Sequence, residues 1–256
     1  MRTKALFYTR DSLRNKKPGR EKERSYVRSD TRNIKSEVHA CGYLLRFEGY
    51  GVYLQKKTLH ASEQQREDVV EARSQWKAEQ PKVESERLVF IDEAGAKTNM
   101  TRLYGRAIKG KRANDYAPHG HYCTTTMISS IRHDGTSECM TIEGSTTAEV
   151  FRSYVEKYLV PTLRPGDIVV MDNLSSHKDK TAQRLIEEAG AQVRFLPPYS
   201  PDLNPIEKMW SKVKAILRSL KARTKETLFD AIGFALKCVT PQDAIGWFNS
   251  CGYIKI

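Results

Sequence analysis

The chain has 256 residues, 39% of them hydrophobic and 29% charged, and a formal net charge of +12. Its length and composition suit a globular protein with one large core, and five scattered cysteines exclude a disulfide framework. No apolar run is long enough to span a membrane and the start lacks an apolar signal core, so we expect a cytoplasmic protein with no membrane partner. The positive charge favours polyanions, nucleic acid first, as partners.

The positive charge is concentrated at the N-terminus. Residues 1–39 hold twelve Lys or Arg against five Asp or Glu, and they show no sustained hydrophobic period. This segment is either a solvated basic tail or an arm that binds a partner, and the two interpretations are compatible. A short apolar stretch with glycines follows and leads to the basic pair Lys56 and Lys57.

Helices and strands alternate from residue 62 onward. Helices are predicted over 62–80, 147–163, 178–190, 204–220, 225–238 and 241–250, and strands over 87–93, 123–133, 137–144, 167–173 and 191–197. The first helix is expected to begin at Ser62, to bury Val69, Val70, Ala72 and Trp76, and to end before Pro81. This order predicts an α/β domain with a mixed sheet. The first three strands form a meander that turns at 133–135, and the later strands pair through helical crossovers.

Two of the predicted strands end in an aspartate where further apolar residues would be expected. These are Asp92 and Asp172. Because the carboxyl ends of neighbouring strands meet at one edge of an α/β sheet, we expect the two carboxylates within a few ångströms of each other, where they repel unless a cation lies between them. Taken singly, each aspartate would cap a helix or accept a hydrogen bond at the end of its strand. Glu93 faces the opposite side of its strand, so the metal role goes to Asp92.

A third candidate acid follows a segment stiffened by proline, "LPPYSPDLNPIEKMW" over 196–210. Its prolines restrict the backbone up to Asn204, which is predicted to cap the next helix, and Pro205 takes the first helical position. Glu207 then lies in the first turn. A carboxylate there also complements the helix dipole, but that needs no stiffening, whereas a metal ligand must be held in place. Three carboxylates suit Mg²⁺ or Mn²⁺.

Two further segments carry polar or basic clusters. Segment 100–112, "MTRLYGRAIKGKR", is either a solvated basic loop or a segment that binds the DNA backbone beside the acids. Its basic residues are Arg102, Arg106, Lys109, Lys111 and Arg112. In "HGHYC", His119, His121 and Cys123 would share one face of a strand. This cluster could hold a metal, but a strand face with mixed polar contacts explains it as well.

The acidic motifs resemble those of DDE transposases of bacterial insertion sequences, in the mariner-superfamily branch. They are "VFIDEAG" around Asp92, "VVMDNLSSH" around Asp172 and the proline motif around Glu207, with 34 residues between the second and third acids. The resemblance covers about residues 56 to 253, and the proline motif is its most specific part. It implies a ribonuclease-H-like catalytic domain over 56–256, after a basic segment, 1–55, with an incomplete helix-turn-helix region.

The resemblance also implies an activity. A transposase of this kind cleaves DNA and transfers strands with two Mg²⁺ or Mn²⁺ ions, here held by Asp92, Asp172 and Glu207. Its partner is double-stranded DNA, as transposon ends and target; a homodimer and a location at the bacterial nucleoid agree with this. His177 is placed either to touch DNA or a metal-bound phosphate or to stabilise its loop. The residues expected to contact DNA are Lys56, Lys57, His177, Lys178 and the five basic residues of 100–112.

Two other interpretations remain. A truncated, non-transposing DNA-binding remnant of such an element is the main alternative, and the presence of all three acids argues against it. A junction resolvase of the same fold would leave the proline motif unexplained. Since residues 1–37 offer basic charge without the period of a helical core, we expect DNA binding with little sequence preference.

Overall fold

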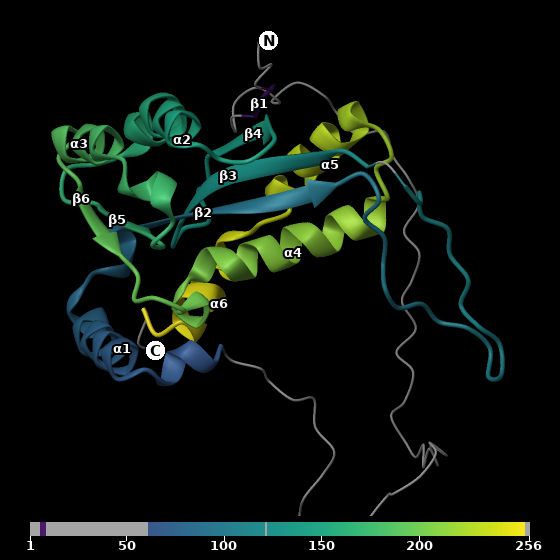
Figure 1. The fold of residues 1–256 in the computed structure, drawn as a ribbon, viewed down its shortest axis with the longest axis horizontal. Helices are drawn as coiled ribbons and strands as arrows, with labels where there is room; N and C mark the ends of the chain where they lie inside the picture. The colour runs from purple at the N-terminus through teal and green to yellow at the C-terminus, as the bar shows by residue number, and fades with distance from the viewer. Residues whose placement is uncertain (1–5, 9–60, 121, 254–256) are drawn as a thin grey trace, which may run out of the picture. The chain divides into compact units, whose positions relative to one another are not determined.

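The computed structural model describes residues 6–8, 61–120 and 122–253, in which a six-stranded mixed sheet carries helices on both faces (Figure 1). The strands are β1 (Leu6–Tyr8), β2 (Leu88–Lys97), β3 (Thr124–Arg132), β4 (Cys139–Glu143), β5 (Ile168–Met171) and β6 (Gln192–Phe195). The helices are α1 (Glu67–Glu79), α2 (Ala148–Tyr154), α3 (Lys180–Glu188), α4 (Pro205–Leu220), α5 (Lys225–Lys237) and α6 (Pro241–Ser250). The predicted α/β class is confirmed.

The strands follow the order β1-β4-β3-β2-β5-β6 across the sheet. β2, β3 and β4 form the predicted antiparallel meander, whereas β5 pairs parallel to β2 and β6 parallel to β5. Helices α2 and α3 supply the two crossovers. Strand β1 was not predicted: its three residues pair antiparallel with β4. Lys56, Lys57 and the expected helix-turn-helix remnant lie outside the described residues.

The turn between β3 and β4 falls where the sequence predicted it. Gly135 adopts φ 81° there and donates its backbone N–H to the Arg132 carbonyl at 3.0 Å. A Cβ at this position would also come within 3.2 Å of the Thr240 carbonyl oxygen. Both the left-handed backbone and the close approach therefore favour glycine.

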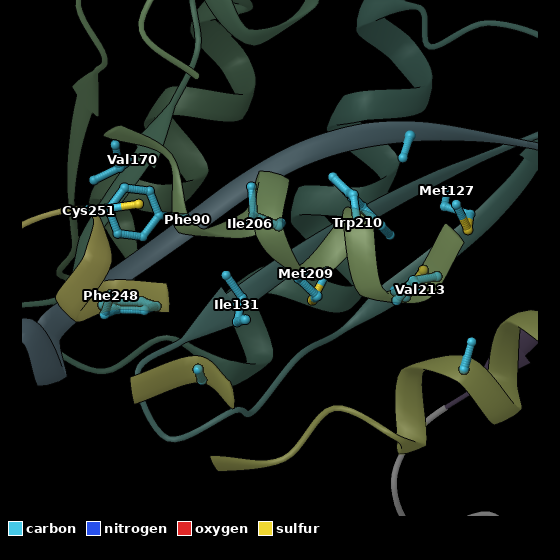
Figure 2. Close-up of a cluster of buried hydrophobic side chains, with 14 of the residues drawn as sticks. Phe90, Met127, Ile131, Val170, Ile206, Met209, Trp210, Val213, Phe248 and Cys251 are labelled. Atoms are coloured by element: carbon cyan, nitrogen blue, oxygen red, sulfur yellow. The ribbon is translucent and has the colours of Figure 1, made fainter. Parts of the chain in front are cut away.

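Alternate residues of the central strands pack into two separate cores. Phe90 of β2 and Val170 of β5 belong to the core beneath α4, α5 and α6, together with Met127 and Ile131 of β3 (Figure 2). Val89, Ile91, Val169 and Met171 belong to the core beneath α2 and α3. Because side chains alternate along a strand, even-numbered positions of β2 and β5 face α4.

Helix α4 buries one apolar face against the sheet. Ile206, Met209, Trp210, Val213 and Leu217 are all buried. Figure 2 shows the first four of them against β2 and β3. Each such side chain contributes roughly 1.5 to 3 kcal/mol when it leaves water. This packing fixes the direction of the helix and with it the position of its first turn.

Helix α1 begins later than predicted. Ser62 opens a 3-10 turn, Ser62–Gln65, and the α-helix itself starts at Glu67. Val69 is buried, but Val70 is 49% exposed, so its predicted burial is wrong. The predicted helix over 147–163 is also divided, since α2 continues into a π turn, Val155–Leu159, and a 3-10 turn. Within the described part of the chain, no helix combines the length and the apolar character that crossing a bilayer requires.

Candidate active site

The sequence predicted that Asp92 ends its strand, but the residue lies in the middle of β2. The strand continues to Lys97 because β3 pairs with it over that whole length. Its parallel pairing with β5 stops earlier, at Phe90 opposite Val170. The same register carried two residues further places Asp92 next to Asp172, so the two acids meet where the β2–β5 ladder ends rather than where both strands end.

The three candidate acids line one cavity of about 450 Å³. Asp92 and Asp172 occupy even-numbered positions, on the face that α4 covers, and Glu207 comes from the first turn of α4. Asp92 is 9% exposed, whereas Glu207 is exposed to the cavity. The remaining walls are the loop after β5 and the proline segment, namely Asn173, Leu174, Leu196, Pro197, Pro198, Tyr199, Ser200, Pro201 and Asn204.

The cavity concentrates negative charge. Burial, followed by the charges of Glu207, Glu93 and Asp172, raises the pKa of Asp92 to about 8. Burial also opposes ionisation of Asp172, but hydrogen bonds from His177 and from the Leu174 amide hold the pKa of that carboxyl below its usual range. Neighbouring carboxyls of opposite tendency are typical of functional sites.

The proline segment positions Glu207 with an unusual backbone. Tyr199 adopts φ 54°, which is rare for a residue with a side chain, and a 3-10 turn, Pro201–Leu203, leads into α4. Pro205 takes the first helical position as predicted. Asn204 precedes it at the expected capping position, but its side chain forms no capping hydrogen bond. The Asn204 Oδ1 atom is buried without a hydrogen-bond partner among the described residues.

Helix α1 and the 3-10 turn before it hold the proline segment from outside, through contacts that no local sequence pattern indicates. Arg73 donates two hydrogen bonds to Asp202, at 2.9 and 2.7 Å, and a third to Ser200 Oγ at 2.7 Å. Gln64 donates to the Tyr199 carbonyl at 2.5 Å. We name these contacts of Gln64 and Arg73 the α1 clasp. A forked guanidinium–carboxylate pair is directional as well as strong, so the clasp fixes the segment that leads to Glu207.

His177 does not face solvent. Its side chain is fully buried, with one ring nitrogen beside Asp172 and the other beside Glu93. Glu93 lies on the opposite face of β2 from Asp92, as predicted, and its contact with His177 was not foreseen. Lys178, the next residue, is exposed.

The five basic residues of 100–112 are all exposed, on a segment that joins β2 to β3. We name residues 98–118 the basic arm, and Figure 1 shows it projecting away from the sheet. Its base is held by Arg223, which donates to the carbonyls of Thr98 and Met100, and by an ion pair of Lys221 with Asp115. Lys221 follows the C-terminus of α4, about 21 Å along the helix from Glu207.

The described residues of the histidine motif next to this segment do not belong to a strand. His119 and Cys123 lie exposed before β3 begins, and His121 is outside the described residues.

The donors around the cavity are hard oxygens. The carboxylates of Asp92, Asp172 and Glu207 line it, a set that suits Mg²⁺ or Mn²⁺. Across residues 61–120 and 122–253, however, no three His, Cys, Asp or Glu side chains already stand as a closed set of ligands. The donor chemistry therefore fits a divalent ion, and side-chain rotation would have to close the set around it.

Comparison with solved structures gives the fold. The Mos1 transposase paired-end complex with left transposon end matches at a TM-score of 0.63 and 17% identity, over 77% of this chain and 63% of that one. The Mos1 mariner paired-end complex with Mn matches at 0.61 and 16%, over 78% and 64%. The catalytic domain of Mos1 mariner transposase matches at 0.51 and 13%, over 77% and 91%. The sheet has the ribonuclease-H-like fold of that catalytic domain, as predicted, and the chain spans about 63% of the first of these transposases.

A match to one protein family covers more than half of the chain. No curated protein sequence matches it significantly. The family model of the DDE superfamily endonucleases matches residues 87–229, which include Asp92, Asp172 and Glu207. The chain therefore belongs to the DDE superfamily endonucleases.

Proposed function

We propose that this chain cleaves DNA with divalent metal ions and transfers the freed strand to target DNA, as the transposase of a bacterial insertion sequence. The observation that carries the proposal is the cavity in which Asp92, Asp172 and Glu207 meet. Burial and the neighbouring acids raise the pKa of Asp92 to about 8, so an apposed cation would favour the ionised form of the whole set. Such a concentration of acids serves a reaction better than it serves stability.

Asp92, Asp172 and Glu207 are the residues that would hold two Mg²⁺ or Mn²⁺ ions. A two-metal site stabilises both the attacking and the leaving oxygen of an in-line displacement at phosphorus. The chain itself keeps these carboxylates in place by three separate means: the β2–β3 ladder for Asp92, hydrogen bonds to Asp172, and the packing of α4 for Glu207. The Mos1 structures with Mn and with Mg support this choice of ions.

Double-stranded DNA is the proposed substrate, as transposon ends and as target. The Mos1 structures include complexes with a transposon end and a strand transfer complex. In this chain, Lys178 and the exposed basic side chains of the arm provide phosphate contacts, with Lys56 and Lys57 as further candidates. Work on chromosomal DNA would place the protein at the nucleoid, and a homodimer would bring two ends together.

The role of the arm can be measured through salt. Neutralising Arg106, Lys109 and Lys111 together should flatten the slope of log affinity against log salt by roughly two to three units, because each lost phosphate contact removes about one unit. A matched control neutralises Lys157, Lys180 and Arg184, on the face covered by α2 and α3. Equal slopes for the arm variant and the wild type would show that these three residues of the arm do not contact DNA phosphates.

The catalytic proposal is tested by nicking of supercoiled plasmid with Mg²⁺ or Mn²⁺. We expect metal-dependent nicking by the wild type, none by Glu207→Gln, and wild-type nicking by Asp134→Asn on the β3–β4 turn. Nicking that survives in Glu207→Gln would refute the site. DNA binding without any nicking by the wild type would instead favour the alternative, a non-transposing remnant of such an element.

A further inference from the structure

A buried histidine joins the two faces of the sheet at the candidate active site. His177 Nδ1 lies 2.7 Å from Asp172 Oδ1, and His177 Nε2 lies 3.1 Å from Glu93 Oε1. The imidazole is 0% exposed and the Glu93 side chain only 12% exposed. Two carboxylates 79 positions apart in the chain are thus connected through one ring.

The ring has little freedom to move. Phe151 packs against it with ring centroids 4.5 Å apart, and both ring nitrogens face carboxylate oxygens. The backbone is also held, since His177 donates its N–H to the Leu174 carbonyl at 3.0 Å and accepts from Gln183 at 3.2 Å. A side chain fixed in this way can determine the orientation of whatever it binds.

Asp172 receives its orientation at one oxygen. Its Oδ1 accepts from both His177 and the Leu174 amide, at 2.7 and 2.9 Å. Neither bond engages Oδ2, and the side chain remains 48% exposed on the cavity wall. The carboxylate plane is therefore set from behind, while Oδ2 stays available to the cavity.

Glu93 lies outside the cavity, on the other face of β2 from Asp92. Its side chain contacts His177, which in turn contacts Asp172 on the cavity wall. The alternative is a purely structural role, in which His177 only provides a hydrogen-bond partner for the buried Glu93 carboxylate. That interpretation predicts a cost in stability alone and leaves the second bond, to Asp172, without a purpose.

We propose that Glu93 and His177 are positioning residues, which together hold Asp172 with its Oδ2 toward the cavity for a divalent cation. The inference rests on the proposed function, since it assigns these residues to the same site. Because Glu93 adjoins Asp92, strand β2 holds one acid directly and the second one through the imidazole. A shift of β2 would move both acids together.

Mn²⁺ binding to the full chain, without DNA, tests the inference apart from catalysis. Free Mn²⁺ is followed by electron paramagnetic resonance during titration, and each variant's folded fraction is measured by urea denaturation. We expect His177→Phe, which keeps the packing on Phe151, to lower Mn²⁺ affinity about 10- to 100-fold. Glu93→Ala should lower it about tenfold, and Glu93→Gln, which keeps an acceptor oxygen, should recover part of that loss.

A double-mutant cycle gives the decisive comparison. If Glu93 acts only through His177, then Glu93→Ala should cost nothing more in Mn²⁺ affinity once His177→Phe is present. His133→Ala, remote from the cavity and packed on Phe248, is the control and should leave affinity unchanged. If His177→Phe does not fold, Glu93→Ala against Glu93→Gln still decides the matter.

Variants with lower stability but wild-type Mn²⁺ affinity would overturn the inference and leave the proposed function standing. Fully additive losses in the cycle would overturn it as well. A wild-type protein that neither binds Mn²⁺ nor nicks DNA would instead refute the proposed function, and the inference with it.

Discussion

Replacing Asp92 with asparagine should stabilise the protein while destroying its proposed activity. The carboxyl is 9% exposed, and burial with the nearby acids raises its pKa from 3.8 to about 8. Between these values the folded protein binds a proton that the unfolded chain has lost, so the free energy of unfolding falls as pH rises, by about 1.4 kcal/mol per pH unit. The fall ends above about pH 8, where both states are ionised. Asparagine has no such proton.

The free energy of unfolding of Asp92→Asn should therefore exceed that of the wild type by an amount that grows by about 2 to 3 kcal/mol from about pH 5.5 to about pH 7.5. The assay is urea denaturation in EDTA, followed by tryptophan fluorescence, since Trp210 is fully buried. Asp179→Asn is the control of opposite sign. Asp179 caps α3 and pairs with Arg152, which holds the pKa of that carboxyl low, so the substitution should destabilise.

Mg²⁺ supplies a second arm of the same experiment. An ion bound by the carboxylates should stabilise the wild type more than Asp92→Asn, and so reduce the difference between their free energies of unfolding. A difference that stays constant with pH would show that Asp92 ionises as freely in the folded protein as in the unfolded chain. The electrostatic argument for the cavity would then be wrong.

Four further outcomes are expected. Asp172→Ala should abolish nicking but leave DNA affinity in a filter-binding assay unchanged or higher, because a negative charge near phosphates is removed. Arg73→Ala should lower the free energy of unfolding in urea by about 1 to 2 kcal/mol, and Arg73→Lys should recover less than half of it, since lysine cannot form the forked pair. Leu217→Ala should cost about 2 to 4 kcal/mol in the same assay, whereas Lys214→Ala should change it by less than about 0.5. In Asp92→Asn, stability should fall as pH rises from 6.5 to about 9, because carboxylate bonds raise the pKa of buried His177 to about 9; His177→Phe should flatten that slope.

Hydrophobic period was enough to predict most elements. Helix α4 and the central strands form close to the predicted ranges and pack their apolar sides into the two cores, because a hydrophobic pattern encodes which face meets the core. Asp92 was misplaced for the same reason. An acid after four apolar residues looks like the end of a strand, whereas β3 extends beyond β5 and keeps β2 paired to Lys97. Strand length was set by a partner, which no local pattern reports.

The three acids that line the cavity could be proposed from the sequence, but the contacts that hold them could not. Glu93 next to Asp92, and His177 five residues after Asp172, were the available signals, and strand alternation assigned Glu93 correctly to the opposite face. It did not reveal that a buried ring would connect that face to the cavity. The pair of Arg73 with Asp202 spans 129 positions, so only the folded chain brings it together.

Each acid is held by a different kind of force, and this bears on how the site tolerates its own charge. Backbone pairing on β3 fixes Asp92 and hydrogen bonds fix Asp172, while the packing of α4 and the α1 clasp fix Glu207. None of these supports depends on attraction among the acids, which repel one another. Since supports made of separate elements fail independently, loss of one should displace one acid and leave the other two in place. The exception is β2, which carries Asp92 and Glu93 side by side and so governs two of the three.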